Sequence, residues 1–519
     1  MITLWEEDLY WQELLRQEGI RFRVGSRLSG RDVVVLNREP AESHVHRIWQ
    51  HIQSGGSLLA AGVNAAAVWL ELSPSVKRLR WLAPDVDSPL FGNVGIVDTE
   101  TRGTLLSGAN AGVTDSGAKA ILATPAGRGF CILLPFEVHE VLSKIASGPK
   151  QFPADTPRFP HETVARVSRG EVRRLVANCL RFLLARKGLP YVHLAAVPGP
   201  TPSTFAFRVD ADFVPRRDIE AVARLADRVG MKFSWYVNVA VHAAYLDLFA
   251  DLARQGHDIQ LHCQRHTVYP DYQRNLDNFR LGKETMADAG ISPVGVVGPY
   301  GEWNLNLNRA FEDLGFEYSS EFCLAYDDLP FRPVVGGRLS RVLQVPVHPI
   351  CLGRLAAARA TPKQMAAYFR SVIDLQVARR EPCFLYDHPE RIDQFSDLLA
   401  DVLHYAKERC GSVTTMTQFV RWWQRRERFD WSSHVSDKEL EIKADTGGED
   451  LSVIVEQDGR FASSPAATGE YEFAALKWQP LPEPVRFDPD SLAVRKPSLM
   501  LHARSLRRRA RKNLRGHGG

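Results

Sequence analysis

The chain has 519 residues, which is too long for a single hydrophobic core and indicates about three folding units. Hydrophobic residues make up 45% of it and charged residues 24%, as in ordinary globular proteins, and no apolar run reaches the roughly 20 residues of a membrane-spanning helix. The start of the chain is acidic at Glu6, Glu7 and Asp8, whereas a secretory signal begins basic, so we expect a cytoplasmic protein. Seven scattered cysteines without a C-x-x-C pair indicate reduced thiols and argue against a structural zinc ribbon.

In residues 1–150, short apolar runs alternate with polar stretches. The apolar runs predict buried strands at 33–36, 57–62 and 127–136, and a helix is predicted at 42–53. Strands that alternate with helices are typical of a parallel α/β sheet.

This first region resembles the flavodoxin-like domain of class I glutamine amidotransferases. The nucleophilic cysteine of that family follows a central strand and precedes a helix. Here the second predicted strand continues into Gly62-Val63-Asn64-Ala65-Ala66, and no cysteine follows it. We therefore expect an amidotransferase-like α/β domain over 1–150 that is not itself catalytic.

Residues 151–203 are predicted to be a helical connector, with an amphipathic helix at 171–187 and a break at Pro198-Gly199-Pro200. A second α/β region follows at 204–427. It is built from repeated strand–helix units, which are typical of a complete or an incomplete barrel. Its predicted strands are 204–209, 232–237, 257–261, 294–298, 342–346 and 382–386, and its predicted helices are 216–229, 243–255, 271–289, 304–314, 362–379 and 391–409.

After Arg428 the pattern changes from helical to alternating. Residues 439–444 and 451–456 alternate polar with apolar side chains, as half-buried antiparallel strands do, and 457–460 supplies a turn. The pattern predicts a small β module over 435–478.

The end of the chain, 479–519, reads as a proline-containing linker followed by a basic tail. Nine of the 65 basic residues lie between Arg495 and Arg515 with no acid among them, so the rest of the chain is mildly acidic. Leucines and alanines recur there at helical spacing, which predicts a helix that binds an anionic membrane surface, at the inner face of the membrane. Nucleic acid would attract the same charge, but we expect no specific nucleic-acid partner, and a solvated tail is the alternative.

Two histidines and two acids stand where predicted barrel strands end. His262 and His266 are four residues apart, a spacing that puts both imidazoles on one face if the segment turns as a helix. Asp210 and Asp212 follow the strand at 204–209. One acid can complete a His-His-Asp metal site and the other can act as general base, although a single Asp at this position is also a common helix cap.

A third strand, 382–386, leads to His388 in Tyr386-Asp387-His388-Pro389. A histidine near a metal site can protonate a leaving amine. Taken alone, such a histidine is more often structural, but here it is the third His or Asp site at a strand end of the same region.

Four motifs together resemble the polysaccharide deacetylases, carbohydrate esterase family four, also called the chitooligosaccharide-deacetylase homology domain. Arg208-Val209-Asp210-Ala211-Asp212 is similar to the D-x-D form of the first motif of that family. Gly256-His257-Asp258-Ile259-Gln260-Leu261-His262-Cys263-Gln264-Arg265-His266 is similar to the second, Val297-Gly298-Pro299-Tyr300-Gly301 to the third, and Leu385-Tyr386-Asp387-His388 to the last. The resemblance covers about 204–425 and extends to the closing helix at 414–423.

The resemblance implies a distorted (β/α)7-type barrel and a divalent metal, zinc or a similar ion. It implies Asp210 as catalytic base, His388 as general acid and the Tyr300 backbone N–H as oxyanion donor. It implies a metal site formed by Asp212, His262 and His266, and contacts to the substrate from Arg208, Arg265, Pro299 and Trp303.

Two positions depart from the family pattern. Val297 stands where the third motif usually has the arginine that pairs with the catalytic Asp, and Arg208 or Arg265 could replace it. Cys263 stands where the second motif usually has Ser or Thr.

The sequence thus predicts a metal-dependent amide hydrolase that removes an acyl group, most often acetyl in this family, from an N-acylated sugar or from a lipid-linked or surface-glycan precursor. The alternative is a carbohydrate-binding scaffold of weak or no activity within a polysaccharide-assembly complex. The sugar, the acyl group, the metal and the oligomeric state stay open at this stage.

Overall fold

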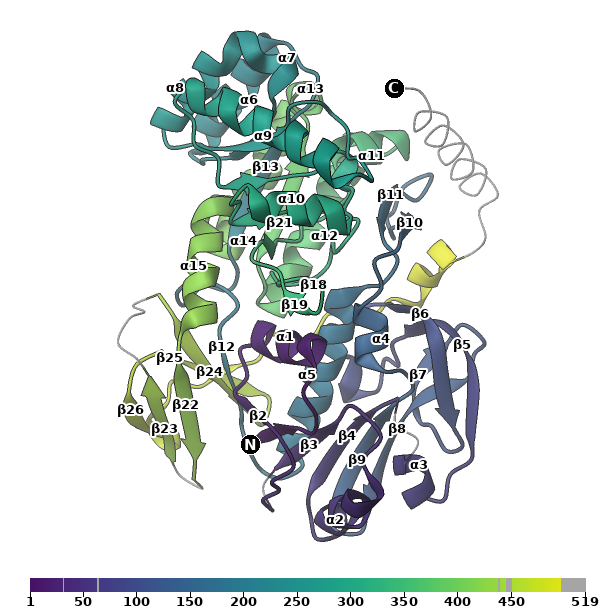
Figure 1. Ribbon diagram of the computed structural model, residues 1–519. Coiled ribbons are helices and arrows are strands. Elements are labelled where there is room, and N and C mark those ends of the chain that lie inside the picture. Colours follow the sequence, from purple (N-terminus) through teal and green to yellow (C-terminus); the bar gives the residue numbers. More distant parts are fainter. Residues whose placement is uncertain (31, 63–64, 437–438, 445–449, 496–519) are drawn as a thin grey trace.

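The computed structural model describes residues 1–30, 32–62, 65–436, 439–444 and 450–495. The predicted membrane-binding tail lies outside the described residues from Lys496 onward. Figure 1 shows three regions: an N-terminal α/β region, a barrel-like α/β region stacked on it, and a small C-terminal β region beside both. Within the described chain, no helix combines the length and apolar character needed to cross a lipid bilayer.

The N-terminal region is built on a nine-stranded mixed sheet of order β2-β1-β3-β4-β9-β8-β7-β5-β6. The first five strands in this order are parallel, and they follow the 2-1-3-4-5 order described for flavodoxin-like sheets. The other four strands extend the sheet in antiparallel fashion, and the sequence patterns did not predict them. The strands are β1 (Ile2–Leu4), β2 (Phe22–Val24), β3 (Val33–Leu36), β4 (Ser57–Ala61), β5 (Pro74–Ala83), β6 (Val97–Leu106), β7 (Ala111–Thr114), β8 (Lys119–Ala126) and β9 (Gly129–Leu134).

Helices cover both faces of this sheet, which is why its central strands are apolar at every position. Val33 and Val35 pack toward one face, and Val34 and Leu36 toward the other. The first face is covered by α1 (Leu9–Gln17), α4 (Val138–Leu142) and α5 (Arg169–Ala185), and the second by α2 (Glu42–Gln53) and α3 (Ala65–Trp69). The helix predicted at 171–187 is therefore α5, and it packs on the N-terminal sheet.

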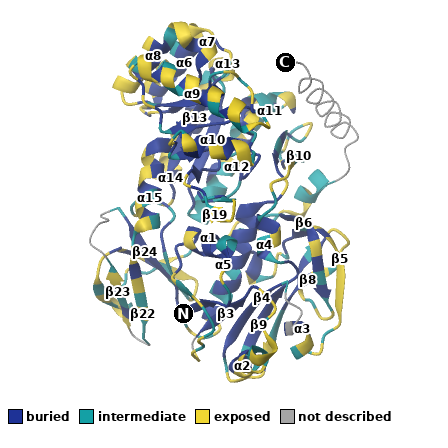
Figure 2. Cartoon of the chain, viewed as in Figure 1, coloured by how far each residue is buried: buried dark blue, intermediate teal, exposed yellow. Residues whose placement is uncertain are grey.

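The barrel-like region contains a curled, seven-stranded parallel sheet of order β20-β17-β16-β15-β14-β13-β21, as the resemblance implied in outline. Figure 2 shows these strands buried beneath helices that are exposed on their outer faces. Sequence patterns missed β17, which has only two residues. The strands are β13 (Phe205–Ala211), β14 (Ser234–Asn238), β15 (Asp258–Cys263), β16 (Gly295–Val296), β17 (Tyr318–Ser319), β20 (Leu343–Gln344) and β21 (Cys383–Asp387).

The surrounding helices match the predicted ones except where the chain is interrupted. The helix predicted at 243–255 begins only at Leu246, after a separate short helix and a 3-10 turn. The helix predicted at 391–409 is divided in two, because Phe395 leaves the helical conformation. The helices are α6 (Arg216–Val229), α7 (Val239–His242), α8 (Leu246–Arg254), α9 (Tyr272–Asp288), α10 (Leu305–Asp313), α11 (Leu352–Ala357), α12 (Pro362–Arg379), α13 (Pro389–Gln394), α14 (Ser396–Cys410) and α15 (Met416–Arg428).

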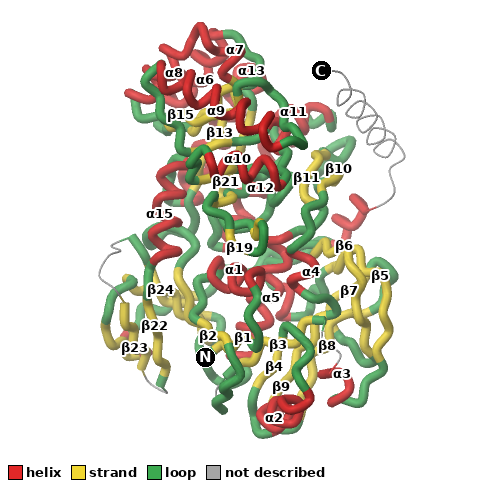
Figure 3. The backbone as a smooth tube through the Cα atoms, viewed as in Figure 1, coloured by secondary structure: helices red, strands yellow, loops and turns green. Residues whose placement is uncertain are grey.

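The C-terminal β region consists of two small antiparallel sheets, of orders β12-β24-β25-β27 and β22-β23-β26. The predicted turn at 457–460 joins β24 to β25, while the strand predicted at 439–444 lies in the other sheet. Figure 3 shows the strands of this region beside helix α15. They are β12 (Tyr191–Leu194), β22 (Trp431–Val435), β23 (Glu439–Ala444), β24 (Ser452–Gln457), β25 (Arg460–Pro465), β26 (Gly469–Glu472) and β27 (Gln479–Pro480).

Two hairpins complete the chain. The strands β10 (Ser147–Gln151) and β11 (His161–Ala165) leave the N-terminal region and reach the barrel, where Ala165 N–H donates to the Phe322 carbonyl at 3.0 Å. The second hairpin, β18 (Val334–Val335) with β19 (Arg338–Leu339), lies on the barrel itself. The first hairpin is important below, because it adds a side chain to the mouth of the barrel.

Candidate metal centre and active site

Strand β13 carries two functional side chains on one face and a third just beyond its end. Side chains alternate along a strand, so Arg208 and Asp210 both project into the barrel. Asp212 follows directly after Ala211, and its backbone N–H donates to the Asp210 carbonyl at 3.1 Å. The two acids thus lie at the C-terminal end of a parallel strand, where barrel enzymes place their reactive groups.

His262 occupies a bulge in the pairing of β14 with β15. Val237 pairs with Leu261 and Asn238 pairs with Cys263, so His262 is the additional residue. Bulges of this kind bend a strand end and redirect a side chain. The side chain of His262 is held by a hydrogen bond between its Nδ1 and the Val297 carbonyl at 2.8 Å, which leaves Nε2 directed toward Asp212.

His266 reaches the same point by a bend, which corrects the expectation of a helical turn after His262. Asn278 of α9 holds this bend with three hydrogen bonds. Its Oδ1 accepts the Arg265 backbone N–H at 2.7 Å, and its Nδ2 donates to the carbonyls of Arg265 and Thr267 at 3.0 and 3.1 Å. The spacing of the two histidines was the correct signal, although the local structure differs.

Asp212, His262 and His266 converge. The Nε2 atoms of the two histidines are 3.0 Å apart, and they lie 3.0 and 3.3 Å from the two carboxylate oxygens of Asp212. One donor atom from each of the three residues lies within 4.8 Å of the others. Burial alone would raise the pKa of Asp212, but the hydrogen bonds and charges of the histidines outweigh it and hold that pKa far below its usual range.

These three residues fit a divalent metal. Two imidazole nitrogens and a carboxylate are a common zinc ligand set that leaves positions for water and substrate. Asp212 Oδ1 is buried and faces His262 Nε2 at 3.0 Å. Two facing Nε2 atoms beside an ionised carboxylate give a concentration of lone pairs that a cation would satisfy.

Arg208 takes the place of the arginine that the third motif lacks. Its Nε and Nη2 donate to the two oxygens of Asp210, both at 2.6 Å, and its Nη1 donates to the Ser320 carbonyl at 2.9 Å. The guanidinium is almost fully buried between the rings of Tyr236 and Tyr386. A bidentate pair of this kind fixes both the position and the orientation of the Asp210 carboxylate.

His388 also approaches Asp212, with 3.6 Å between its Nε2 and Asp212 Oδ2. Burial would lower the pKa of His388, but hydrogen bonding to Cys351 and the negative charges of Asp212 and Asp210 raise it to about 10. The neighbouring Asp387 is buried, and its carboxylate accepts the backbone N–H groups of His388 and Leu352 at 2.9 and 2.6 Å. His388 is therefore held beside Asp210 and Asp212, and its raised pKa favours the protonated imidazole.

The third motif forms a tight turn at the mouth of the barrel. Tyr300 has a φ of 60°, the left-handed region that non-glycine residues rarely adopt, and its ring stands 4.7 Å from the His266 ring. Pro299 is buried beside it. Glu321, which sequence reasoning missed, is fully buried and accepts the Gly298 backbone N–H at 2.8 Å, so it anchors the start of this turn.

A cavity of about 70 Å³ opens over these groups. Asp210, Asp212, His262, Tyr300 and His388 line it, as the sequence predicted. The remaining lining residues were not assigned to the site: Gly301 and Tyr386 lie within the motifs, whereas Glu162 of β11, Phe322 and Arg354 of α11 come from outside them. Glu162 and Arg354 are joined by an ion pair, and the β10–β11 hairpin is what brings Glu162 there.

Of the four residues predicted to contact substrate, Arg208, Arg265, Pro299 and Trp303, none lines the cavity. The Arg265 side chain is exposed and does not line the cavity. Trp303 packs in a small apolar cluster with Leu324, Ala325 and Phe331. The sequence around Arg265 and Trp303 did not show which way these two side chains point.

Comparisons with known proteins found similarity among solved structures. No protein-family model matches the chain, and no curated protein matches it by sequence. Among solved structures, a protein assigned as a polysaccharide deacetylase in Mycobacterium smegmatis is 18% identical, with a TM-score of 0.39 over 45% of this chain and 94% of that one. One so assigned in Pseudomonas aeruginosa PAO1 is 16% identical, with a TM-score of 0.39 over 44% and 93%. Puue allantoinase is 16% identical, with a TM-score of 0.38 over 44% and 92%.

Proposed function

We propose that this protein is a metal-dependent amide hydrolase that removes an acyl group, acetyl in the first instance, from an N-acylated sugar or from a lipid-linked or surface-glycan precursor. The observation that carries this proposal is the convergence, at one cavity, of three metal-ligand side chains with a carboxylate and a histidine able to move protons. A binding scaffold without catalysis would need the metal ligands but not the oriented Asp210 and His388.

In the proposed site, Asp212, His262 and His266 hold a divalent ion, and zinc suits two imidazoles with one carboxylate. When bound, such an ion polarises the amide carbonyl and lowers the pKa of water toward about 7, so that a carboxylate can take its proton at neutral pH. The hydrogen bond from His262 to the Val297 carbonyl keeps the Nε2 atom of that ring available as the ligand.

Two residues handle protons in this proposal. Asp210 accepts a proton from the attacking water at a carboxylate oxygen, and Arg208 keeps that carboxylate in position. His388 gives its Nε2 proton to the leaving nitrogen, so that an amine departs. Because both groups face the same cavity as Asp212, neither has to move far during the reaction.

The backbone N–H of Tyr300 donates to the oxygen that becomes negative in the tetrahedral intermediate. Removing one such donor typically costs about 3 kcal/mol of transition-state stabilisation. The left-handed conformation of Tyr300 fits this role, since strained backbone is often retained where it directs a functional group.

For the substrate, the proposal assigns contacts differently from the motif pattern. Arg208 acts through Asp210 and is a positioning residue, because its donors are used by Asp210 and Ser320. The rim pair Glu162 and Arg354 is the more direct candidate for contact with a sugar. Membrane attachment through the basic tail remains a separate proposal, which vesicle sedimentation with and without 496–519 would test.

The experiment combines metal content with turnover on N-acetylated sugars. Full-length protein is expected to contain zinc and to release acetate from N-acetylglucosamine oligomers, and a chelator is expected to stop the reaction until zinc is restored. Asp210→Asn should keep the zinc and lose about 10²-fold to 10⁴-fold in turnover, whereas His262→Ala should lose both. Asp247→Asn, at an exposed acid of the same region, is the matched control.

The results separate the two candidate functions. Zinc binding without turnover on any acylated sugar would favour the carbohydrate-binding scaffold. Failure to bind any divalent metal would refute both the metal site and the hydrolase.

A further inference from the structure

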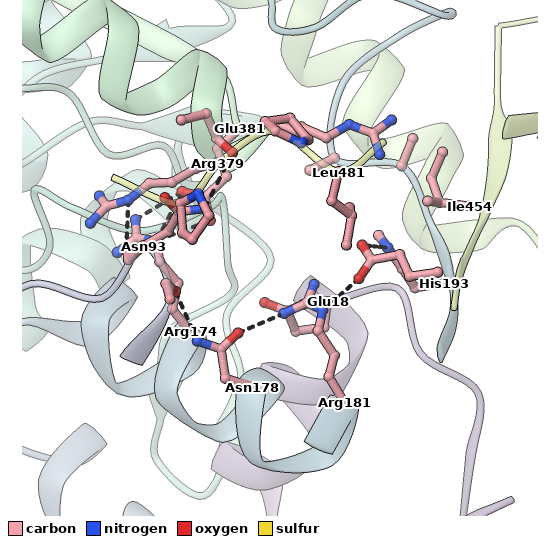
Figure 4. Close-up of a pocket in the computed structure, with 18 of the residues that line it drawn as sticks. Glu18, Asn93, Arg174, Asn178, Arg181, His193, Arg379, Glu381, Ile454 and Leu481 are labelled. Carbon is pink, nitrogen blue, oxygen red and sulfur yellow. Dashed lines mark hydrogen bonds and ion pairs between the residues drawn. The ribbon is translucent and has the colours of Figure 1, made fainter. Parts of the chain in front are cut away.

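A cavity of about 420 Å³ lies where the N-terminal region, the barrel and the C-terminal β region meet, and it shares no lining residue with the cavity of the metal centre. This volume falls within the range of small-molecule sites. Figure 4 shows α5 along one side, with Arg174, Asn178 and Arg181 directed from it toward the cavity. The opposite sides come from the end of α12, the segment after β12, β24 and the segment 481–484.

Helix α5 has two faces of different character. Arg174, Asn178 and Arg181 recur at i, i+4 and i+7 and therefore share one face. The other face, with Leu175 and Cys179, packs in the core against the N-terminal sheet. Packing on the sheet thus does not explain the polar face, which is directed to the cavity.

Most arginines around the cavity are neutralised by acids. Each makes at least one short ion pair, which fixes its guanidinium group in place. The pairs are Arg174 Nη2 to Glu381 Oε2 at 2.8 Å, Arg181 Nε to Glu456 Oε2 at 2.8 Å, Arg379 Nη2 to Glu171 Oε1 at 2.9 Å, and Arg173 Nη2 to Glu381 Oε1 at 2.7 Å.

Arg380 is different. Within the described part of the chain it has no ion pair and no side-chain hydrogen bond, and its guanidinium lies over the Phe461 ring at 3.8 Å. Burial lowers the pKa of Arg380; the negative charge of Glu456 opposes this effect, and the smaller effect of the Arg181 charge adds to it. The guanidinium is half-buried and no described acid pairs with it, so its N–H donors are available to a ligand that supplies a counter-charge.

Apolar side chains and the segment 481–484 also border this cavity. Ile454, Leu481 and Pro482 contribute apolar surface. The segment that carries Leu481 crosses the cavity from the β region to the N-terminal region, where the Val485 N–H donates to Asn93 Oδ1 at 2.7 Å. A ligand held here would contact a cation on one side and apolar groups on the other.

We propose that this cavity binds a small organic oxyanion, a molecule of about monosaccharide size with one phosphate or carboxylate group, and that Arg380 is its charge partner. The planar guanidinium can donate two parallel hydrogen bonds to either group. The body of the ligand lies against Ile454, Leu481 and Pro482. This site is independent of the metal centre, and it joins all three regions of the molecule.

Calorimetric titration of the full-length protein tests the proposal with three probes of similar size: glucose 6-phosphate, glucuronate and glucose. Arg380→Gln removes the charge, and Ala196→Trp fills the cavity while keeping every arginine. Arg359→Gln is the matched control, since Arg359 is exposed and also has a left-handed backbone after a helix, with a φ of 63° against 57° for Arg380. Metal-free protein serves to separate this binding from binding at the metal centre.

At least one of the two anions is expected to bind while glucose does not, and the comparison of phosphate with carboxylate identifies the group. Arg380→Gln should weaken binding about tenfold or more, Ala196→Trp should abolish it, and Arg359→Gln and metal removal should leave it unchanged. The proposal is overturned if neither anion binds, or if binding survives in both Arg380→Gln and Ala196→Trp. Should Ala196→Trp fail to fold, Arg380→Gln against its control still decides.

Discussion

Arg208 precedes Asp210 by two residues in the chain, and its guanidinium donates to the Asp210 carboxylate. An arginine in the third motif would reach the same carboxylate from another strand. The alternation of side chains along β13 is what makes this possible, because positions 208 and 210 share the barrel-facing side. Two parallel hydrogen bonds define the plane of the carboxylate, so the proton acceptor of the proposed reaction depends on this one side chain.

We predict that Arg208→Gln lowers kcat about 10²-fold, because a displaced Asp210 carboxylate no longer meets the attacking water correctly. KM and zinc content should change little, since the metal ligands are separate residues. Arg208→Lys should recover part of the activity, as it restores the charge but not the bidentate geometry. Steady-state kinetics and elemental analysis of the purified variants provide the measurements.

Arg265→Gln is the control for this prediction, because Arg265 is exposed and outside the cavity. It should retain wild-type kcat. Equal activity in Arg208→Gln and Arg265→Gln would contradict the assigned role. Since a buried Asp210 without its partner also destabilises the fold, by about 3–5 kcal/mol for a buried pair, thermal unfolding is recorded for each variant.

At this scale, sequence reasoning found the residues whose chemistry is encoded in local spacing. Asp210, Asp212, His262, His266 and His388 all stand at or just after strand ends. All of them except His266 line the cavity, and His266 Nε2 lies 3.3 Å from Asp212 Oδ2. Glu162 and Arg354 could not be found this way. Glu162 reaches the site on the β10–β11 hairpin and Arg354 on helix α11, and neither element carries one of the barrel motifs. Outside a regular strand or helix, spacing does not fix which way a side chain points, and Arg265 and Trp303, both expected at the substrate, lie elsewhere.

Helix α5 is the element on which the regions meet. One face packs on the N-terminal sheet, another lines the interdomain cavity, and its first turn abuts the barrel. At that first turn, Gly170 lies so close to the barrel that an added Cβ would stand 1.9 Å from the Asp327 carbonyl oxygen. Only glycine permits this approach.

We therefore predict that Gly170→Ala destabilises the protein by about 1–3 kcal/mol, as overpacking does, although alanine is the better helix former by about 1 kcal/mol. The thermal midpoint is the measurement. Gly353→Ala is a close control, since Gly353 is likewise the second residue of its helix but has no contact nearer than 3.7 Å. It should be neutral or slightly stabilising, and a similar loss in both variants would refute the packing explanation.

Elements were predictable where a periodic pattern is long enough. The helices α6, α9, α10 and α12 lie within a residue or so of their predicted ranges. Strand β17 was missed because two residues carry no detectable period. Of the antiparallel strands that were missed, β5 is largely exposed and polar, so it lacks the apolar run that revealed the parallel strands.

Across the whole molecule, buried charges hold the regions together. Arg173 of α5 pairs with Asp328 of the barrel at 2.7 Å and with Glu381 at 2.7 Å, and it also contacts Glu18 of the N-terminal region. No pattern in the sequence identifies such a cluster, because each acid is more than a hundred residues from Arg173. Glu13, a buried acid between two regions, is not part of such a cluster.

Glu13 of α1 is buried against the barrel, where its Oε1 accepts the Arg332 backbone N–H at 2.6 Å. Burial, with repulsion from Glu427 in second place, raises its pKa from 4.5 to about 7. Between pH 4.5 and 7 the folded protein therefore keeps a proton on Glu13 that the unfolded chain has lost. The contribution of Glu13 to stability is fully present below pH 4.5 and is lost as the pH rises through 7. The shift corresponds to a loss on the order of 3 kcal/mol above pH 7.

Glu13→Gln removes this charge and keeps the acceptor for Arg332. The variant is expected to match the wild type at pH 5 and to be more stable at pH 8, with a higher denaturation midpoint in urea at the same m-value. Glu6→Gln, at a partly exposed acid of the same region, should leave the pH profile unchanged. If the wild type and Glu13→Gln lose stability equally between pH 5 and 8, Glu13 is not the group that couples the docking of α1 on the barrel to pH.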